Sequence, residues 1–171
     1  MRRSVLLILA VTAFVMLPTF GARGASIPDP NDVASRLDVK RATITKVADD
    51  APVTVTIRFW QGFDDAVLSG RNRVAVWFFC PACFSPAYRA IVSYRPGPAV
   101  IRVHLDDLGG SDPYPDRIVQ RPQPNVLTFT VRMGIAFNQS GVVSGFVRSY
   151  DHCPSSCVRD RAPDHGRIFS N

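Results

Sequence analysis

Four cysteines stand in two closely spaced pairs, Cys80 with Cys83 and Cys153 with Cys157. In an oxidising compartment such pairs form disulfides, and each of these two loops contains a proline. Two other interpretations fit the spacing: the four thiolates could complete a tetrahedral zinc site, and Cys-x-x-Cys is the spacing of thiol oxidoreductases. We favour disulfides and predict the local bonds Cys80–Cys83 and Cys153–Cys157, because each thiol has its partner close by in the chain. Redox chemistry through Cys80 and Cys83 is one enzymatic alternative.

Titratable residues concentrate near the C-terminus, where Asp160, Asp164 and His165 form a candidate functional cluster and His152 lies beside the second cysteine pair. A histidine paired with an aspartate can act as a general acid or base. The sequence, however, contains none of the motifs that mark an activated serine, a zinc protease or a phosphate-binding loop. We therefore predict that the protein is not an enzyme. The hydrolytic alternative is an exported enzyme that works through His152, His165 and Asp164.

All fourteen acidic residues are aspartates, and several stand in turn-like clusters. Calcium binds six to eight oxygen atoms, which carboxylates and exposed carbonyls in such turns can supply. Aspartate also favours turns without any metal, because its side chain accepts hydrogen bonds from nearby backbone N–H groups. We therefore predict no cofactor, and the alternative is calcium at one of the clusters Asp49–Asp50, Asp64–Asp65, Asp106–Asp107 or Asp160 with Asp164.

The arginines are spread along the chain without a basic run, and the formal net charge of +6 falls to +3 without the three arginines of residues 1–24. Nucleic-acid binding depends on a basic patch that displaces counterions, so we predict no nucleic-acid partner. Trp60, at a strand end and in the polar register, is the candidate ligand-binding aromatic residue. Trp77 lies in the most apolar segment and is predicted to be in the core.

The first 24 residues have the pattern of a cleaved secretory signal peptide. Basic Arg2 and Arg3 precede an uncharged apolar stretch over residues 5–17, and Ala22 and Gly24 are the small residues that a signal peptidase requires. Residues 4–22 are also long enough to act as a signal anchor, which is the alternative. We predict a secreted or otherwise extracytoplasmic protein with no membrane span after cleavage.

The rest of the chain is predicted to be one β-rich domain. It contains no glutamate, two lysines and thirteen prolines, so support for helices is weak. Hydrophobic and polar residues alternate over Val53–Trp60 with the period of a half-buried strand. Further strands are predicted over residues 37–47, 74–79, 88–94, 99–105, 126–131, 142–150 and 167–169. Residues 64–69 are the one segment with helical potential, and it is too short to change the fold class. We expect an all-β fold, an antiparallel β-sandwich of jelly-roll or Ig-like type with roughly eight strands over residues 37–171, after an N-terminal lead over residues 25–36.

Three segments resemble the uncharacterised small secreted β-sandwich proteins of actinomycete-like bacteria. They are Asp32-Val33 followed by Leu37-Asp38-Val39, the alternating segment Val53–Trp60, and the motif Asp160-Arg161-Ala162-Pro163-Asp164-His165-Gly166. The resemblance implies a sandwich fold and export. More distantly, the layout is similar to carbohydrate-binding modules of family nine or of the DOMON type, although the chain lacks a clear aromatic platform and a haem-ligand pattern.

These observations predict a secreted, non-catalytic β-sandwich with a binding or cell-envelope role. Its ligand is an unknown extracellular or cell-surface molecule, and a glycan is one candidate. The loops over residues 106–116 and 121–125 are long for turns, so we expect them, together with Trp60, to carry the binding surface.

Overall fold

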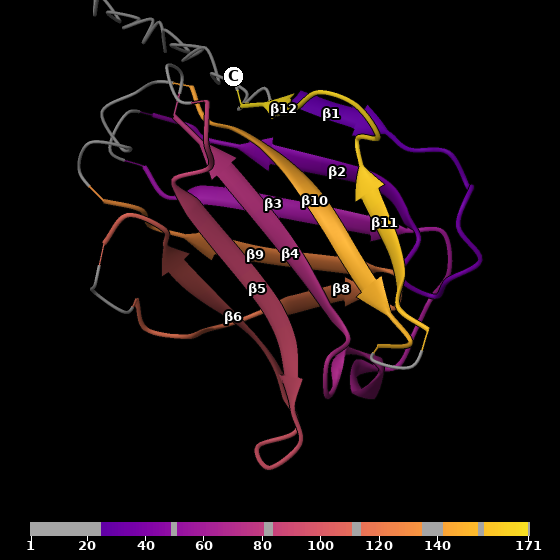
Figure 1. The fold of residues 1–171 in the computed structure, drawn as a ribbon. Coiled ribbons are helices and arrows are strands. Elements are labelled where there is room, and N and C mark those ends of the chain that lie inside the picture. The colour runs from indigo at the N-terminus through magenta and orange to yellow at the C-terminus, as the bar shows by residue number, and fades with distance from the viewer. Residues whose placement is uncertain are drawn as a thin grey trace, which may run out of the picture.

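The computed structural model describes residues 25–48, 51–80, 84–110, 114–134, 142–153 and 156–170. It is a β-sandwich of two antiparallel sheets packed together, as the sequence predicts (Figure 1). Residues 1–24, which carry the predicted signal, lie outside the described part of the chain. No helix within the described ranges is long and apolar enough to cross a membrane.

The first sheet, at the back in Figure 1, has five strands in the order β1-β2-β3-β9-β8. Their bounds are Ala25–Pro28 (β1), Val39–Thr45 (β2), Val53–Phe59 (β3), Val126–Val131 (β9) and Gln120–Gln123 (β8). In β3, the central strand, every second residue from Val53 to Phe59 is fully buried, which confirms the predicted alternation.

The second sheet, in front in Figure 1, has the order β11-β10-β4-β5-β6-β7, and β12 also pairs with β10. Its strands are Val158–Ala162 (β11), Ser144–Asp151 (β10), Arg73–Phe79 (β4), Tyr88–Arg95 (β5), Val100–Asp107 (β6), Arg117–Ile118 (β7) and Ile168–Phe169 (β12). β5 and β6 form the predicted hairpin, whose turn is closed by a hydrogen bond of 3.2 Å from the N–H of Ala99 to the carbonyl of Pro96. The one segment with helical potential in the sequence, residues 64–69, contains a 3-10 helix, η1, at Asp65–Leu68.

Side chains from both sheets fill the core, and Gly145 in β10 marks a point of very close approach. A Cβ atom at this position would lie 2.5 Å from the carbonyl oxygen of Trp77 on the neighbouring strand and 2.8 Å from Cδ1 of Ile44 on the facing sheet. Only glycine fits between these two atoms, so the residue allows β2 and β10 to pack closely.

All eight predicted strands are present, and the structure adds four, β1, β7, β8 and β11. These four are the strands at the ends of the two sheets. Edge strands are commonly short and polar, so they lack the hydrophobic alternation that makes a strand visible in a sequence. One consequence is that the segment predicted as an N-terminal lead contains β1, which pairs with β2 from Ala25 to Pro28.

Candidate functional site

At one edge of the second sheet, the outward side of β11, β10 and β4 carries mostly arginine and aromatic side chains. β10 lies between β11 and β4, and the antiparallel register aligns outward positions of the three strands in rows. Asp160 in the middle of β11 is buried, so the two arginines beside it point outward. We call the set the arginine–aromatic face; its members are Arg73, Trp77, Phe146, Arg148, Tyr150, Arg159 and Arg161.

Guanidinium groups lie over the rings of this face. The rings of Trp77 and Phe146 stack, with centroids 5.1 Å apart and planes inclined by 17°. The guanidinium carbon of Arg148 lies 5.4 Å from the Trp77 centroid and 5.5 Å from that of Phe146. On the other side, the guanidinium of Arg161 lies 4.6 Å from the Phe146 ring. Such contacts fix the plane of a guanidinium without consuming its N–H donors.

The arrangement repeats one row further along the strands. Tyr150 lies between two arginines, with the guanidinium carbon of Arg73 4.8 Å and that of Arg159 6.0 Å from its ring centroid. Beyond the opposite end of the face, Arg167 lies 3.6 Å from the centroid of Phe79. Cations and rings therefore alternate along β10 and across the row of Tyr150.

The four arginines of the arginine–aromatic face form no ion pair with a carboxylate within the described ranges. Arg161 donates instead to the backbone carbonyls of Asp164 and Gly166. The adjacent strand behaves differently, because Arg89 on β5 is neutralised by Asp106 at 2.6 Å. The face is thus a local concentration of positive charge that the sequence, with its dispersed arginines, does not reveal.

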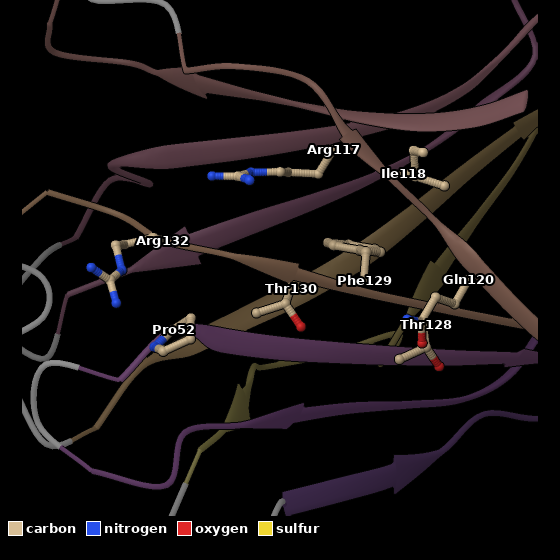
Figure 2. A pocket seen from close by; sticks show the side chains of 8 residues that line it. All are labelled: Pro52, Arg117, Ile118, Gln120, Thr128, Phe129, Thr130 and Arg132. Atoms are coloured by element: carbon tan, nitrogen blue, oxygen red, sulfur yellow. The ribbon is translucent and has the colours of Figure 1, made fainter. Parts of the chain in front are cut away.

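A concave candidate lies at the opposite edge, where β7 faces β9. The groove has a volume of about 510 Å³ and is lined by Pro52, Arg117, Ile118, Gln120, Thr128, Phe129, Thr130 and Arg132. Figure 2 shows the guanidinium groups of Arg117 and Arg132 extending toward the same end of the groove. Both arginines also line an adjoining, more apolar pocket of about 220 Å³, to which the predicted binding loop over residues 106–116 contributes Tyr114 and Pro115.

Three buried aspartates meet at the edge of the sandwich where β1 and β2 of one sheet approach β11 of the other. Asp29 follows β1, Asp38 precedes β2, and Asp160 lies in the middle of β11. Each aspartate contributes one carboxylate oxygen, and these three oxygens all lie within 4.8 Å of one another. The N–H of Val39 donates to Asp160 Oδ2 at 2.7 Å, which joins the start of β2 to β11. We call these three residues the aspartate triad.

The pKa values of the aspartate triad are all raised. Burial, followed by the charges of Asp160, Asp164, Asp32 and Asp38, raises the pKa of Asp29 to about 7. Burial, followed by the charges of Asp160 and Asp32, raises the pKa of Asp38 to about 6. The nearby backbone N–H of Val33, which does not reach hydrogen-bond geometry, opposes this shift only in part. Burial also raises the pKa of Asp160, although backbone N–H groups favour its charged form.

Asp151, the last residue of β10, is equally buried but has a full set of partners. Its Oδ2 accepts hydrogen bonds from Ser35 Oγ at 3.0 Å and from the Arg36 N–H at 3.3 Å. Its Oδ1 accepts from the His152 N–H at 2.9 Å and from Asn72 Nδ2 at 3.4 Å. Asp151 therefore has the contacts of a structural carboxylate, which the aspartate triad lacks.

The predicted C-terminal cluster is only partly brought together. Asp164 influences the pKa values of Asp29 and Asp160, but Asp164 and His165 are exposed beyond the end of β11. His152 lies at the other end of the β10–β11 hairpin, because Asp151 pairs with Val158. The hydrolytic set His152, His165 and Asp164 is therefore not assembled at one place.

Asp29 and Asp38 were not predicted as partners of Asp160. A signal for Asp38 was present, since it stands between Leu37 and Val39, two apolar residues that the structure buries completely. An acid inside such a run is expected to be buried with a partner.

The two tryptophans occupy the outer surfaces of different sheets. Trp60 is 36% exposed, and the Lys40 ammonium lies 4.5 Å from its ring centroid. The prediction that Trp77 lies in the core is wrong, because it is half-buried on the outward side of β4. The apolar run of β4 resembles a strand buried on both faces, but arginine side chains rather than core residues cover its outer side.

The predicted bond between Cys153 and Cys157 is present. It uses both sulfur atoms, which leaves neither as a zinc ligand. Cys83 lies outside the described residues, so the bond between Cys80 and Cys83 stays a prediction.

The other aspartate clusters named as calcium candidates have different contacts. Asp65 pairs with Arg121, and Asp106 contacts both Arg89 and Nε2 of His104. Asp49 and Asp50 lie outside the described residues. None of the described clusters has the unpartnered buried oxygens of the aspartate triad.

Comparison with known proteins finds no matching family model, no similar curated protein and no similar solved structure.

Proposed function

We propose that the protein is an exported, non-catalytic binding module whose ligand is an acidic glycan, held by the arginine–aromatic face. The observation that carries the proposal is the set of four arginines with no carboxylate partner in the described ranges. The guanidinium carbons of Arg73, Arg148 and Arg161 lie 4.6–5.5 Å from the ring centroids of the face. Guanidinium groups match carboxylate and sulfate oxygens in pairs, and such charge-assisted bonds are stronger than neutral ones.

The shape of the face favours a polymer. Neighbouring strands lie about 4.8 Å apart and successive outward residues of a strand about 6.8 Å apart. The four guanidiniums therefore form an extended grid on an open sheet rather than a cluster around one point. A polysaccharide with an anionic group on every sugar or every second sugar can contact several guanidinium groups at once, whereas a small anion contacts one or two.

The covered rings favour a glycan over a nucleic acid. Proteins that bind single strands offer exposed aromatic faces on which bases stack, and duplex readers insert a helix or a β-ribbon into a groove. Here Arg148 and Arg161 lie over the rings of Trp77 and Phe146, and the surface is the flat side of a sheet. Recognition by charge, without base stacking, is the mode that this surface supports.

The proposal is tested by calorimetric titration of the full chain with hyaluronate and with chondroitin sulfate. We expect both to bind, uncharged amylose not to bind, and R148Q/R161Q to weaken binding at least about tenfold, because a charge-assisted hydrogen bond contributes about 1.5–3 kcal/mol. The matched control is R117Q/R132Q, which removes the same charge at the groove of Figure 2 and should change affinity less than about twofold.

Three outcomes would contradict the proposal. The first is no binding of either acidic glycan. The second is a larger loss of glycan affinity in R117Q/R132Q than in R148Q/R161Q, which would place the binding site at the groove. The third is tighter binding of a single-stranded DNA of equal length and charge, which would identify a nucleic acid as the ligand. Thermal midpoints of both variants within a few degrees of the parent protein show that the fold is retained.

A further inference from the structure

The aspartate triad contains carboxylate oxygens that are buried without any partner. Asp38 is 1% exposed, and neither of its side-chain oxygens has a hydrogen-bond partner; Oδ2 of Asp29, a residue 4% exposed, has none either. Asp160 accepts hydrogen bonds only from backbone N–H groups, that of Val39 at 2.7 Å to Oδ2 and that of Arg161. An unpaired charge in such surroundings is costly, so buried carboxylates are normally paired with a cation or coordinate a metal.

No described lysine or arginine forms an ion pair with any member of the triad. The charged groups that act on it are further carboxylates, Asp32 and Asp164, which are exposed at its rim. Asp151 shows how this fold satisfies a buried carboxylate, since it has four hydrogen-bond donors and the Arg36 guanidinium at 3.7 Å. The triad has instead a negative centre and an acidic rim, which is the arrangement that attracts a cation.

The donor atoms indicate which cation fits. All three residues offer only oxygen, which suits hard cations and not zinc or copper. Two oxygens on opposite sides of a calcium ion, each at 2.3–2.6 Å, are about 4.6–5.2 Å apart, whereas opposite ligands of magnesium are about 4.1 Å apart. The three oxygens of the triad lie within 4.8 Å of one another, which is inside the limit for calcium, and the nearby carboxylates and water can complete its larger coordination number.

We propose that Asp29, Asp38 and Asp160 bind one calcium ion, which clamps the β1–β2 connection of the first sheet onto β11 of the second. The site differs from the calcium candidates in the sequence, because Asp38 and Asp29 lie 122 and 131 residues before Asp160 in the chain. Calcium bound here stabilises the folded chain by mass action, since the unfolded chain does not hold these three residues together.

Thermal unfolding of the full chain, in 1 mM calcium chloride and in excess EGTA, tests the proposal together with calorimetric titration of calcium. We expect one calcium ion per chain and a midpoint several degrees higher in calcium, because 100-fold saturation contributes about 2.7 kcal/mol and each kcal/mol corresponds to roughly 2–4 °C. Magnesium at the same concentration should produce a much smaller shift.

The variant D38N tests whether Asp38 is a metal ligand or a residue that only supports the fold. The thermal midpoint of D38N should not rise when calcium is added. In EGTA its midpoint should equal or exceed that of the parent protein, because a buried unpaired charge has been removed. The matched control D64N changes an exposed aspartate and should keep the full calcium shift.

The proposal is overturned if calcium produces neither binding heat nor a shift in the parent protein. It is equally overturned if D38N keeps the full shift, or if it is destabilised to the same extent in calcium and in EGTA. A larger effect of magnesium or zinc would contradict the assignment of calcium. These results do not depend on whether the arginine–aromatic face binds a glycan, because no glycan is present.

Discussion

Asp38 and Asp151 show how two buried aspartates of one chain can differ in chemistry. Both are essentially inaccessible, at 1% and 0% exposure, and both contact the segment that leads into β2. Asp151 accepts hydrogen bonds from three separate segments, around Ser35, Asn72 and His152, whereas Asp38 accepts none. The donors come from up to 116 positions away, so no local pattern could have separated the two residues.

The variant D151N tests the structural role of Asp151. The amide would present its own N–H groups to donors that now point at a carboxylate, so we expect a loss of about 1–3 kcal/mol in the free energy of unfolding, measured in urea. D38N in EGTA is the matched comparison and should show no loss. A free energy of unfolding for D151N within about 0.5 kcal/mol of the parent value would contradict the structural role of Asp151.

A second prediction is the pH dependence of the metal-free protein. The pKa values of Asp29, about 7, and Asp38, about 6, lie above the ordinary value of 3.8. Between pH 3.8 and about 7 the folded chain therefore binds more protons than the unfolded chain. Stability from these groups is complete at low pH and is lost as the pH rises through about 6–7. In EGTA we expect the thermal midpoint to fall by more than about 3 °C between pH 5 and pH 8.

The double variant D29N/D38N isolates this effect from the histidines, which titrate in the same window. It should show a much smaller fall over the same range. A midpoint that rises or stays level in the parent protein, or the same fall in the double variant, would be inconsistent with the raised pKa values.

At the level of elements, interior strands were predictable and edge strands were not. Segments such as Val53–Phe59 alternate because one face packs on the core, and this signal located β3 and most interior strands. β11 has three consecutive charged residues, Arg159 to Arg161, so its sequence does not resemble a strand. It nevertheless supplies Asp160 to the triad and two arginines to the arginine–aromatic face. The candidate sites therefore depend on an element that the sequence did not reveal.

The packing between elements gives a third prediction, for G145A. The added methyl group would overlap the Trp77 carbonyl and Ile44 Cδ1, so β10 must move away from β4 or from β2. We expect a loss of about 1–3 kcal/mol in the free energy of unfolding, measured in urea. G97A, in the open turn between β5 and β6 with no atom within 4 Å of its Cβ position, is the control and should change little. Equal effects of the two substitutions would show that the close approach at Gly145 is not tight.

For the whole molecule, strand order decides which residues meet, and strand order is not encoded in local patterns. The prediction of no nucleic-acid partner assumed that arginines dispersed in sequence are dispersed in space. Instead β4, β10 and β11 lie side by side and bring Arg73, Arg148 and Arg161 onto one surface. The sandwich class and its main strands follow from composition and periodicity. Both candidate sites depend instead on residues at least 65 positions apart in the chain, β4 with β10 in the arginine–aromatic face and Asp29 and Asp38 with Asp160 in the aspartate triad.

The two arginine sites lie at opposite edges of the second sheet, the arginine–aromatic face at β11 and the groove at β7. This separation allows one spectrum to distinguish them. The most direct measurement is an NMR titration of the arginine Nε–Hε signals with hyaluronate. We expect the largest changes at Arg148, Arg161, Arg73 and Arg159, with Arg117 and Arg132 almost unaffected; changes confined to Arg117 and Arg132, or no change at any arginine, would contradict the account.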